Sequence, residues 1–147
     1  MRYLLIILSL TFLNAQWGVA NYVDEFGDLT GNKFLSNTIF GKFSNSATTN
    51  SRLKVTFLVD KDKVSIQLYE YGSSLVKTGI DGYRVSIKYD GNVETFYGVP
   101  LVGDRLKITH NNAKKLINII KENDNIKFHI DGYYKSEYDF TLTNNSK

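Results

Sequence analysis

The sequence contains no cysteine, one proline and two histidines among its 147 residues. Without cysteine the chain forms no disulfide and offers no thiol for lipid attachment, so the domain must rely on its hydrophobic core. Two separated histidines and no cysteine also argue against zinc, which is bound chiefly by those two residue types. We therefore expect no cofactor. Without a leader peptide about 130 residues remain, which is enough for one domain that buries roughly two thirds of its unfolded surface.

A strong excess of positive charge is also lacking. The chain has 18 basic and 15 acidic residues, and loss of Arg2 with a leader peptide would leave 17 basic residues and a net charge of +2. Nucleic-acid-binding domains concentrate more positive charge on one face and carry recognition motifs. No such motif is present, so we do not expect nucleic acid as a partner.

The N-terminus has the pattern of a secretory signal peptide. Arg2 supplies a positive start, and the apolar run LLIILSLTFL at residues 4–13 is too short to span a bilayer. Ala15 is the small residue at the expected cleavage point, which predicts a leader at residues 1–15. Cleavage after Ala20 is the alternative.

The residues around these two positions favour the earlier cleavage, because Trp17 and Val19 resemble the beginning of a strand. We expect residues 16–147 to form a single exported domain, periplasmic or extracellular, with no transmembrane segment in the mature chain.

Apolar and polar residues alternate through most of the remaining chain. In RLKVTFLVD, Leu53, Val55, Phe57 and Val59 alternate with polar neighbours. The same pattern recurs in residues 64–71, 83–90, 105–109, 126–130 and 138–142. Such alternation is typical of antiparallel strands with one buried and one solvated face. We predict an all-β antiparallel sandwich of about eight or nine strands.

Turn sequences separate several of these runs. Residues 60–63 and 90–92 are typical of tight hairpins, and Asp131-Gly132 begins the connection between the last two strands. Further strands are expected at residues 17–24 and 38–43, separated by the glycine-containing loop EFGDLTGNK at residues 25–33.

One segment follows a helical period instead. In NNAKKLINIIKEN, Ala113, Leu116, Ile117 and Ile120 have the spacing of an amphipathic stripe. We predict a short helix near residues 112–122, capped by Asn111 or Asn112, that closes an open end or edge of the sheets.

The loop around YVDEFGDLTGN is a weak calcium candidate. Asp24, Glu25, Asp28 and Asn32 offer the oxygen ligands that calcium takes. Their spacing does not match an EF-hand loop, and Asx and Gly residues also form turns without any metal.

A second polar segment occupies residues 44–51, SNSATTNS, without glycine, proline or charge. Its side chains can bond the local backbone, which predicts a self-hydrogen-bonded connection that could pass between sheets. The alternative is a polar surface for sugar or peptide hydroxyl groups. The candidate ligand-binding residues are Asn45, Ser46, Thr48, Thr49 and Asn50, together with Tyr133 and Tyr134 in the last hairpin turn.

Catalytic groups are poorly marked. His110 and His129 could belong to a Ser/His/Asp arrangement, but no nucleophile elbow of the Gly-x-Ser-x-Gly type is present. Glu70, Glu94 and Glu137 are the carboxylates to consider for glycoside hydrolysis, although spacing alone brings no two of them together. We identify no catalytic residue from the sequence.

Basic residues fall largely on the outward positions of the expected strands. They are Arg52, Lys54, Arg84, Lys88, Arg105, Lys107 and Lys127. On one sheet face, with Tyr69 and Tyr71 as stacking surfaces, they would form a patch for an acidic glycan, a lipid headgroup or an acidic partner. Alternatively they keep exposed faces and edges soluble.

Two segments carry a resemblance to known groups. WGVANYVDEFGDLTGNKF and GKFSNSATTNSRLKV resemble small exported proteins of Bacteroidetes-type bacteria. The pattern LINIIKENDNIKFHIDGYYKSEYDFTL is similar in its order of helix and strands to invasion-associated locus B domains and to type VI secretion accessory domains. These resemblances imply an exported all-β sandwich of the bacterial envelope and assign no catalytic residue.

We therefore predict an exported, envelope-associated or secreted, non-enzymatic binding module of unknown ligand, for which a glycan and an envelope protein are the candidate partners. The alternatives are a glycan-directed hydrolase, which needs two convergent carboxylates in a cleft, and a structural or assembly accessory, which an exposed apolar patch or unpaired edge strand would favour.

Overall fold

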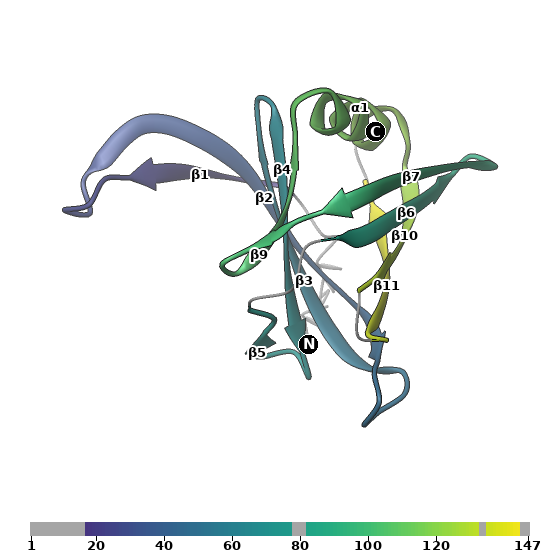
Figure 1. The fold of residues 1–147 in the computed structure, drawn as a ribbon. Helices are drawn as coiled ribbons and strands as arrows, with labels where there is room; N and C mark the ends of the chain where they lie inside the picture. Colours follow the sequence, from purple (N-terminus) through teal and green to yellow (C-terminus); the bar gives the residue numbers. More distant parts are fainter. Residues whose placement is uncertain (1–16, 78–81, 133–134, 145–147) are drawn as a thin grey trace, which may run out of the picture.

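A computed structural model describes residues 17–77, 82–132 and 135–144. The fold is all-β and antiparallel, with one short helix (Figure 1). The elements are β1 (Gly18–Val23), β2 (Leu29–Ser44), β3 (Ser51–Asp60), β4 (Lys63–Glu70), β5 (Ser74–Leu75), β6 (Tyr83–Tyr89), β7 (Asn92–Val99), β8 (Leu101–Val102), β9 (Arg105–Thr109), α1 (His110–Glu122), β10 (Asn125–Asp131) and β11 (Glu137–Thr143).

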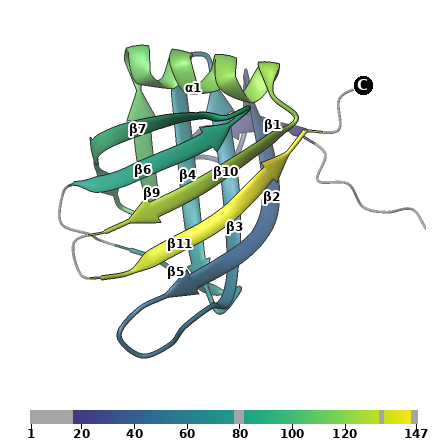
Figure 2. The same cartoon turned by 90° about the vertical axis from the view of Figure 1, so that its right-hand side faces the viewer.

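The sandwich-like arrangement is made by one hydrogen-bonded sheet. Its strand order is β7-β6-β10-β11-β2-β3-β4-β9-β8, with β1 added to β2 and β5 added to β4. Figure 2 shows β6, β7, β10 and β11 crossing in front of β3, β4 and β9, with β2 passing from one layer to the other. The layers thus enclose a common interior, as in an orthogonal packing.

The predicted alternation places the core between these layers. Leu53, Val55 and Phe57 on β3 are fully buried, while their polar neighbours face outward. Phe57 meets Phe128 and Phe140 from the opposite layer, with ring centroids 5.3 and 5.9 Å apart. Aromatic contacts of this kind add to the burial of apolar surface that stabilises the fold.

The N-terminal hairpin differs from the prediction. Residues 25–33 were expected to form a loop, but β2 already begins at Leu29 and pairs with β1 from Leu29 to Ser36. Only residues 24–28 form the turn, because pairing with β1 satisfies the backbone groups of the following residues. Residues 18–34, called the arm below, project from the body as a two-stranded hairpin (Figure 1).

One further difference concerns a connection. Residues 44–51 do not cross between sheets, because β2 and β3 pair directly from Leu35–Val59 to Phe43–Ser51 and the segment is a hairpin loop. The remaining tight hairpins are confirmed: β3–β4 turns at residues 61–62 and β6–β7 at Asp90-Gly91. Both Asp90 and Gly91 have positive φ, as a type I′ turn requires.

The predicted helix is confirmed and covers one open end between the layers (Figure 2). Its N-cap is Thr109 without a side-chain hydrogen bond, so the prediction of capping by Asn111 or Asn112 is wrong. Ala113, Leu116 and Ile120 are buried as expected. Within the described ranges, no helix is long and apolar enough to cross a membrane.

Candidate ligand-binding groove

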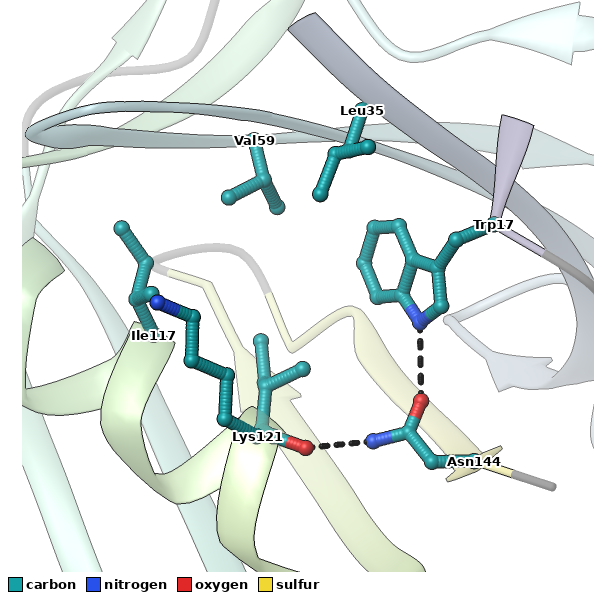
Figure 3. A pocket seen from close by; sticks show the side chains of 7 residues that line it. Trp17, Leu35, Val59, Ile117, Lys121 and Asn144 are labelled. Carbon is teal, nitrogen blue, oxygen red and sulfur yellow. Dashed lines mark hydrogen bonds between the residues drawn. The ribbon is translucent and has the colours of Figure 1, made fainter. Parts of the chain in front are cut away.

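A groove lies where the base of the arm meets the body and α1. Its first hollow has a volume of about 250 Å³ and is lined by Trp17, Leu35, Val59, Ile117, Ile120, Lys121 and Asn144 (Figure 3). A second hollow shares Leu35, Val59, Ile117 and Lys121 with the first and continues to Val19, Lys33, Phe34, Asp60 and Lys61. The two hollows therefore form one groove, whose floor is the sheet and whose wall is α1.

The sheet register explains why apolar residues meet in the floor. Leu35 pairs with Val19 on one side and with Val59 on the other, and directly paired residues point to the same face of a sheet. Ile117 stands above them on α1 and is only partly buried, although the helical stripe predicted it in the core. Ile119, which lies outside the predicted stripe, is buried instead.

Asn144 closes the inner end of the groove. Its side-chain oxygen accepts a hydrogen bond of 2.8 Å from the Trp17 indole nitrogen (Figure 3). Its side-chain nitrogen donates to the backbone carbonyl oxygens of Ile120 and Asn123 at the end of α1. The side chain is only 8% exposed, and its bonds hold the indole, helix and C-terminal strand in one arrangement. A pocket wall held in this way is largely pre-formed.

The outer mouth of the groove is basic. Lys33, Lys61 and Lys121 are exposed there, and none of the three has an ion-pair partner within the described residues. Asp60 is the single carboxylate of the lining, and it accepts a hydrogen bond of 3.0 Å from the Tyr22 hydroxyl. Burial and this bond to Asp60 raise the pKa of Tyr22, so the hydroxyl stays a donor at neutral pH.

A buried amide lies one residue pair deeper. Asn37 is 3% exposed and follows Leu35 on the inner face of β2, opposite Phe57 on β3. Neither its side-chain nitrogen nor its oxygen has a hydrogen-bond partner among the described residues. Buried amides are normally paired, so this position carries a free energy cost in the fold.

The groove was missed from the sequence because its residues are scattered over the chain. Trp17, Val59 and Asn144 belong to three segments that the sequence does not relate, and each residue is unremarkable within its own strand. The sequence signal for the groove is the apolar stripe of the helix, because two of its members, Ile117 and Ile120, line the first hollow.

The polar hairpin loop at residues 44–51 forms internal hydrogen bonds, as predicted from its sequence. The side-chain oxygen of Asn45 accepts from the backbone nitrogens of Ala47 and Thr48 at 2.9 and 3.1 Å. The Ser44 hydroxyl accepts from the Asn50 nitrogen at 3.0 Å, and the Thr48 hydroxyl bonds Ser51. Ser46 and Thr49 are exposed, and their role in ligand binding stays a prediction.

The predicted metal residues Asp24, Glu25 and Asp28 do not line the groove. Tyr133 and Tyr134 fall outside the described residues. At the arm tip, the Asp24 carboxylate accepts from the backbone nitrogens of Phe26 and Asp28, both at 2.9 Å, and so forms the turn. Across residues 17–77, 82–132 and 135–144, no three His, Asp or Glu side chains approach closely enough to hold a metal ion.

The three candidate glutamates have separate surroundings. Glu70 accepts a 3.0 Å hydrogen bond from the buried Tyr138 hydroxyl, whereas Glu94 forms a 2.7 Å ion pair with Lys115 on α1. Glu137 is exposed at the start of β11 and pairs across the sheet with Ser44. None of these glutamates lines the groove.

The basic strand positions divide into several groups. In the first group, two arginines form ion pairs with aspartates. Arg84 pairs with Asp131, and Arg105 lies 2.7 Å from Asp104 and lowers the pKa of that carboxyl. Another group is a cross-strand row in which Lys54 lies between Phe40 and Tyr69.

In this second group, which consists of Lys54 and its neighbour Arg52, the cationic side chains stand over aromatic rings. The Lys54 ammonium stands 4.0 Å from the Tyr69 ring centroid, and the Arg52 guanidinium 4.8 Å from that of Phe40. Tyr71 instead packs edge-on against Phe43 at 4.9 Å. On the other layer, Lys88 on β6 and Lys127 on β10 stand opposite each other. Lys107 on β9 belongs to the layer of Lys54 and is paired with Ser65 on β4.

A Ser/His/Asp row does exist on the outer face of the sheet. His129 pairs with Ser86 on β6 and with Asp139 on β11, and its Nδ1 lies 2.8 Å from the Asp139 carboxylate. The Ser86 hydroxyl, however, bonds Thr95 at 3.2 Å. His110 begins α1 with a positive φ.

Comparison of the chain with protein-family models, with curated proteins and with solved structures found no match. The resemblances stated from the sequence therefore stay predictions.

Proposed function

We propose that this chain is an exported, non-enzymatic binding module and that the groove beside α1 is its ligand site. The observation that carries the proposal is the coincidence, in one groove, of an apolar floor, a hydrogen-bonded inner wall and a basic mouth. Apolar concave sites with a few placed polar groups are the usual form of small-molecule sites. Export itself rests on the leader pattern at residues 1–15.

The lining chemistry favours binding over catalysis. It contains no histidine or hydroxyl nucleophile, and its one carboxylate, Asp60, is engaged by Tyr22. The row Ser86, His129 and Asp139 lies on an open sheet face, where Ser86 bonds Thr95 rather than the imidazole. A glycan hydrolase would need two carboxylates about 5–9.5 Å apart across a cleft, and the groove offers one.

A heteronuclear NMR titration of the secreted protein tests this function. The probes are decan-1-ol as a neutral apolar ligand, neutral and acidic glycans, and calcium. We expect decan-1-ol to shift the amide resonances of Val59, Ile117 and Lys121, which line the groove. Shifts confined to residues 44–51 with a glycan, or to residues 24–28 with calcium, would move the site to those loops. A spectrum unchanged by decan-1-ol would overturn the proposal for the groove.

The arm favours a second candidate function, that of an assembly accessory. β1 pairs with β2 along one edge, and no described strand pairs with its other edge. Val19, Val23, Phe26 and Leu29 on the arm are 57–83% exposed. Because β1 itself carries no charged residue, antiparallel pairing with the β1 strand of a second copy would oppose no like charges.

Sedimentation velocity over a range of protein concentrations tests this second candidate. Val23→Lys would place a charge beside the free edge of β1 and should lower the dimer fraction. Val93→Lys on β7 is the control, because Val93 is also more than half exposed and lies outside the arm. A monomer at all concentrations, or equal effects of both substitutions, would exclude self-association through β1.

A further inference from the structure

The groove has a polarity along its length. At the inner end, the Trp17 indole donates to Asn144, and the Asn144 amide is used by Ile120 and Asn123, so the described polar groups of this wall are engaged with one another. The surface left for a ligand there is the indole face with Leu35, Val59, Ile117 and Ile120. A hydrocarbon chain fits such a surface, because a polar ligand group would lose its hydration without gaining a partner.

The outer mouth has the opposite character. Lys33 comes from the arm, Lys61 from the β3–β4 turn and Lys121 from α1. The three ammonium groups face one carboxylate, Asp60, so the mouth has an excess of positive charge.

Figure 3 shows the Lys121 side chain extending from α1 until its ammonium nitrogen lies beside Ile117 in this view, and both residues line the first hollow. Lysines commonly cover apolar surface with their methylene stems and keep the charge in water. Lys121 is therefore placed to contact a hydrocarbon chain and an anionic head group together.

We propose that the ligand of this groove is a free medium-chain fatty acid, with the hydrocarbon against Trp17, Val59 and Ile117 and the carboxylate among Lys33, Lys61 and Lys121. This inference rests on the groove being a ligand site, and it adds the ligand class. Charge complementarity selects the anionic head. The two hollows of the groove have volumes of about 250 and 270 Å³ and share four lining residues, so together they have room for one hydrocarbon chain with its head group.

The single tryptophan provides the measurement. The chain contains one tryptophan, Trp17, and it lines the groove, so intrinsic fluorescence reports occupation of this site directly. The secreted protein would be titrated with decanoate, decan-1-ol and decyltrimethylammonium, which share a chain length and differ in head-group charge. We expect saturable changes in emission and an affinity for decanoate at least about tenfold above that for the cation.

Variants separate the head group from the chain. Lys33→Gln combined with Lys61→Gln removes two charges of the outer mouth and keeps the Lys121 stem. It should weaken decanoate binding about tenfold and leave decan-1-ol binding unchanged. Lys107→Gln removes an exposed charge on β9, outside the groove, and should change neither affinity. Added salt should weaken decanoate binding more than decan-1-ol binding, because it screens exposed charges.

The outcomes distinguish this inference from the proposed function. Equal affinities for the three probes, or a decanoate affinity unaffected by the double substitution, would overturn the fatty acid assignment and keep the groove as an apolar site. No response of Trp17 to any probe would overturn both. Phosphatidylglycerol vesicles are the last comparison: vesicle binding without a decanoate response would assign the basic mouth to a membrane headgroup and so overturn the free fatty acid.

Discussion

The Trp17 indole and the Asn144 side chain are joined by a 2.8 Å hydrogen bond across 127 positions of the sequence. This bond connects the residue before β1 to the residue after β11, and the same Asn144 amide binds the end of α1. Asn144 is therefore the point at which the start of the domain, its last strand and its helix meet, and it forms the inner wall of the groove.

Loss of the Asn144 side chain should destabilise the fold. Asn144→Ala leaves the Trp17 nitrogen and the Ile120 and Asn123 carbonyl oxygens without their partner, and unsatisfied buried polar groups cost about 1–3 kcal/mol. The free energy of unfolding, measured by urea denaturation, should decrease by this amount. Asn118→Ala, at an exposed position on α1, is the control and should have little effect. Equal effects of the two substitutions would contradict a structural role for Asn144.

Replacement of Asn37 by an apolar residue should stabilise the fold. Because its buried amide has no partner among the described residues, Asn37→Leu removes an unfavourable group of similar size and should raise the free energy of unfolding by about 1 kcal/mol. Chemical denaturation measures the change. A loss of stability would show that the amide makes a favourable interaction in solution. Parallel titration with decan-1-ol would reveal whether that interaction serves the groove.

Gly41 should tolerate no side chain. A Cβ atom there would lie 2.6 Å from Phe140 Cβ and would overlap the backbone oxygen of Asp139, where β2 pairs with β11. Gly41→Ala should therefore cost about 1–3 kcal/mol or more, as overpacking does. Gly18→Ala is the matched control, because its Cβ would meet Ser36 at an ordinary 3.8 Å. Comparable melting temperatures for the two variants would show that β2 and β11 separate easily.

Stability should fall at alkaline pH through Tyr138. Burial, followed by the charge of Glu70 and the hydrogen bond to it, raises the pKa of Tyr138 well above its ordinary value of 10.0. Since the unfolded state loses this proton first, the stabilising effect is complete below pH 10 and is lost as pH rises above it, by at most about 1.4 kcal/mol per pH unit.

Tyr138→Phe isolates this contribution. Urea denaturation between pH 8 and 11 should give a less steep decline for the variant than for the unchanged protein. Tyr83 also has a raised pKa, chiefly from burial, and it should leave a residual slope in the variant. Identical slopes for the two proteins would contradict the assignment to Tyr138.

Intact mass spectrometry of the protein expressed from the full sequence in a bacterium with a secretion system tests the predicted leader. Cleavage after Ala15 would leave Gln16 as the first residue and retain both Trp17 and all of β1. We expect this product, because cleavage after Ala20 would remove Trp17 and the pairs of Gly18, Val19 and Ala20 with β2. A product that begins at Asn21 would show that the protein lacks the Trp17–Asn144 bond and this wall of the groove.

Local patterns predicted most of the secondary structure. The alternation in β3 identified Leu53, Val55 and Phe57 as buried, and Asp90-Gly91 marked a turn that needs positive φ. Both follow from interactions between near neighbours in the chain. The extent of β2 was underestimated, because its first residues are held by pairing with β1 rather than by an apolar pattern of their own.

The two candidate sites differ in how far the sequence predicts them. Hydrogen bonding within residues 44–51 was predictable, because its partners lie within six positions of one another. The groove was not, because Trp17, Val59, Ile117 and Asn144 become neighbours only when the sheet bends and α1 closes its end. Composition and periodicity thus specified an all-β chain with one helix, since those preferences are local. Which side chains share a surface depended on long-range strand order and register, which local preferences do not encode.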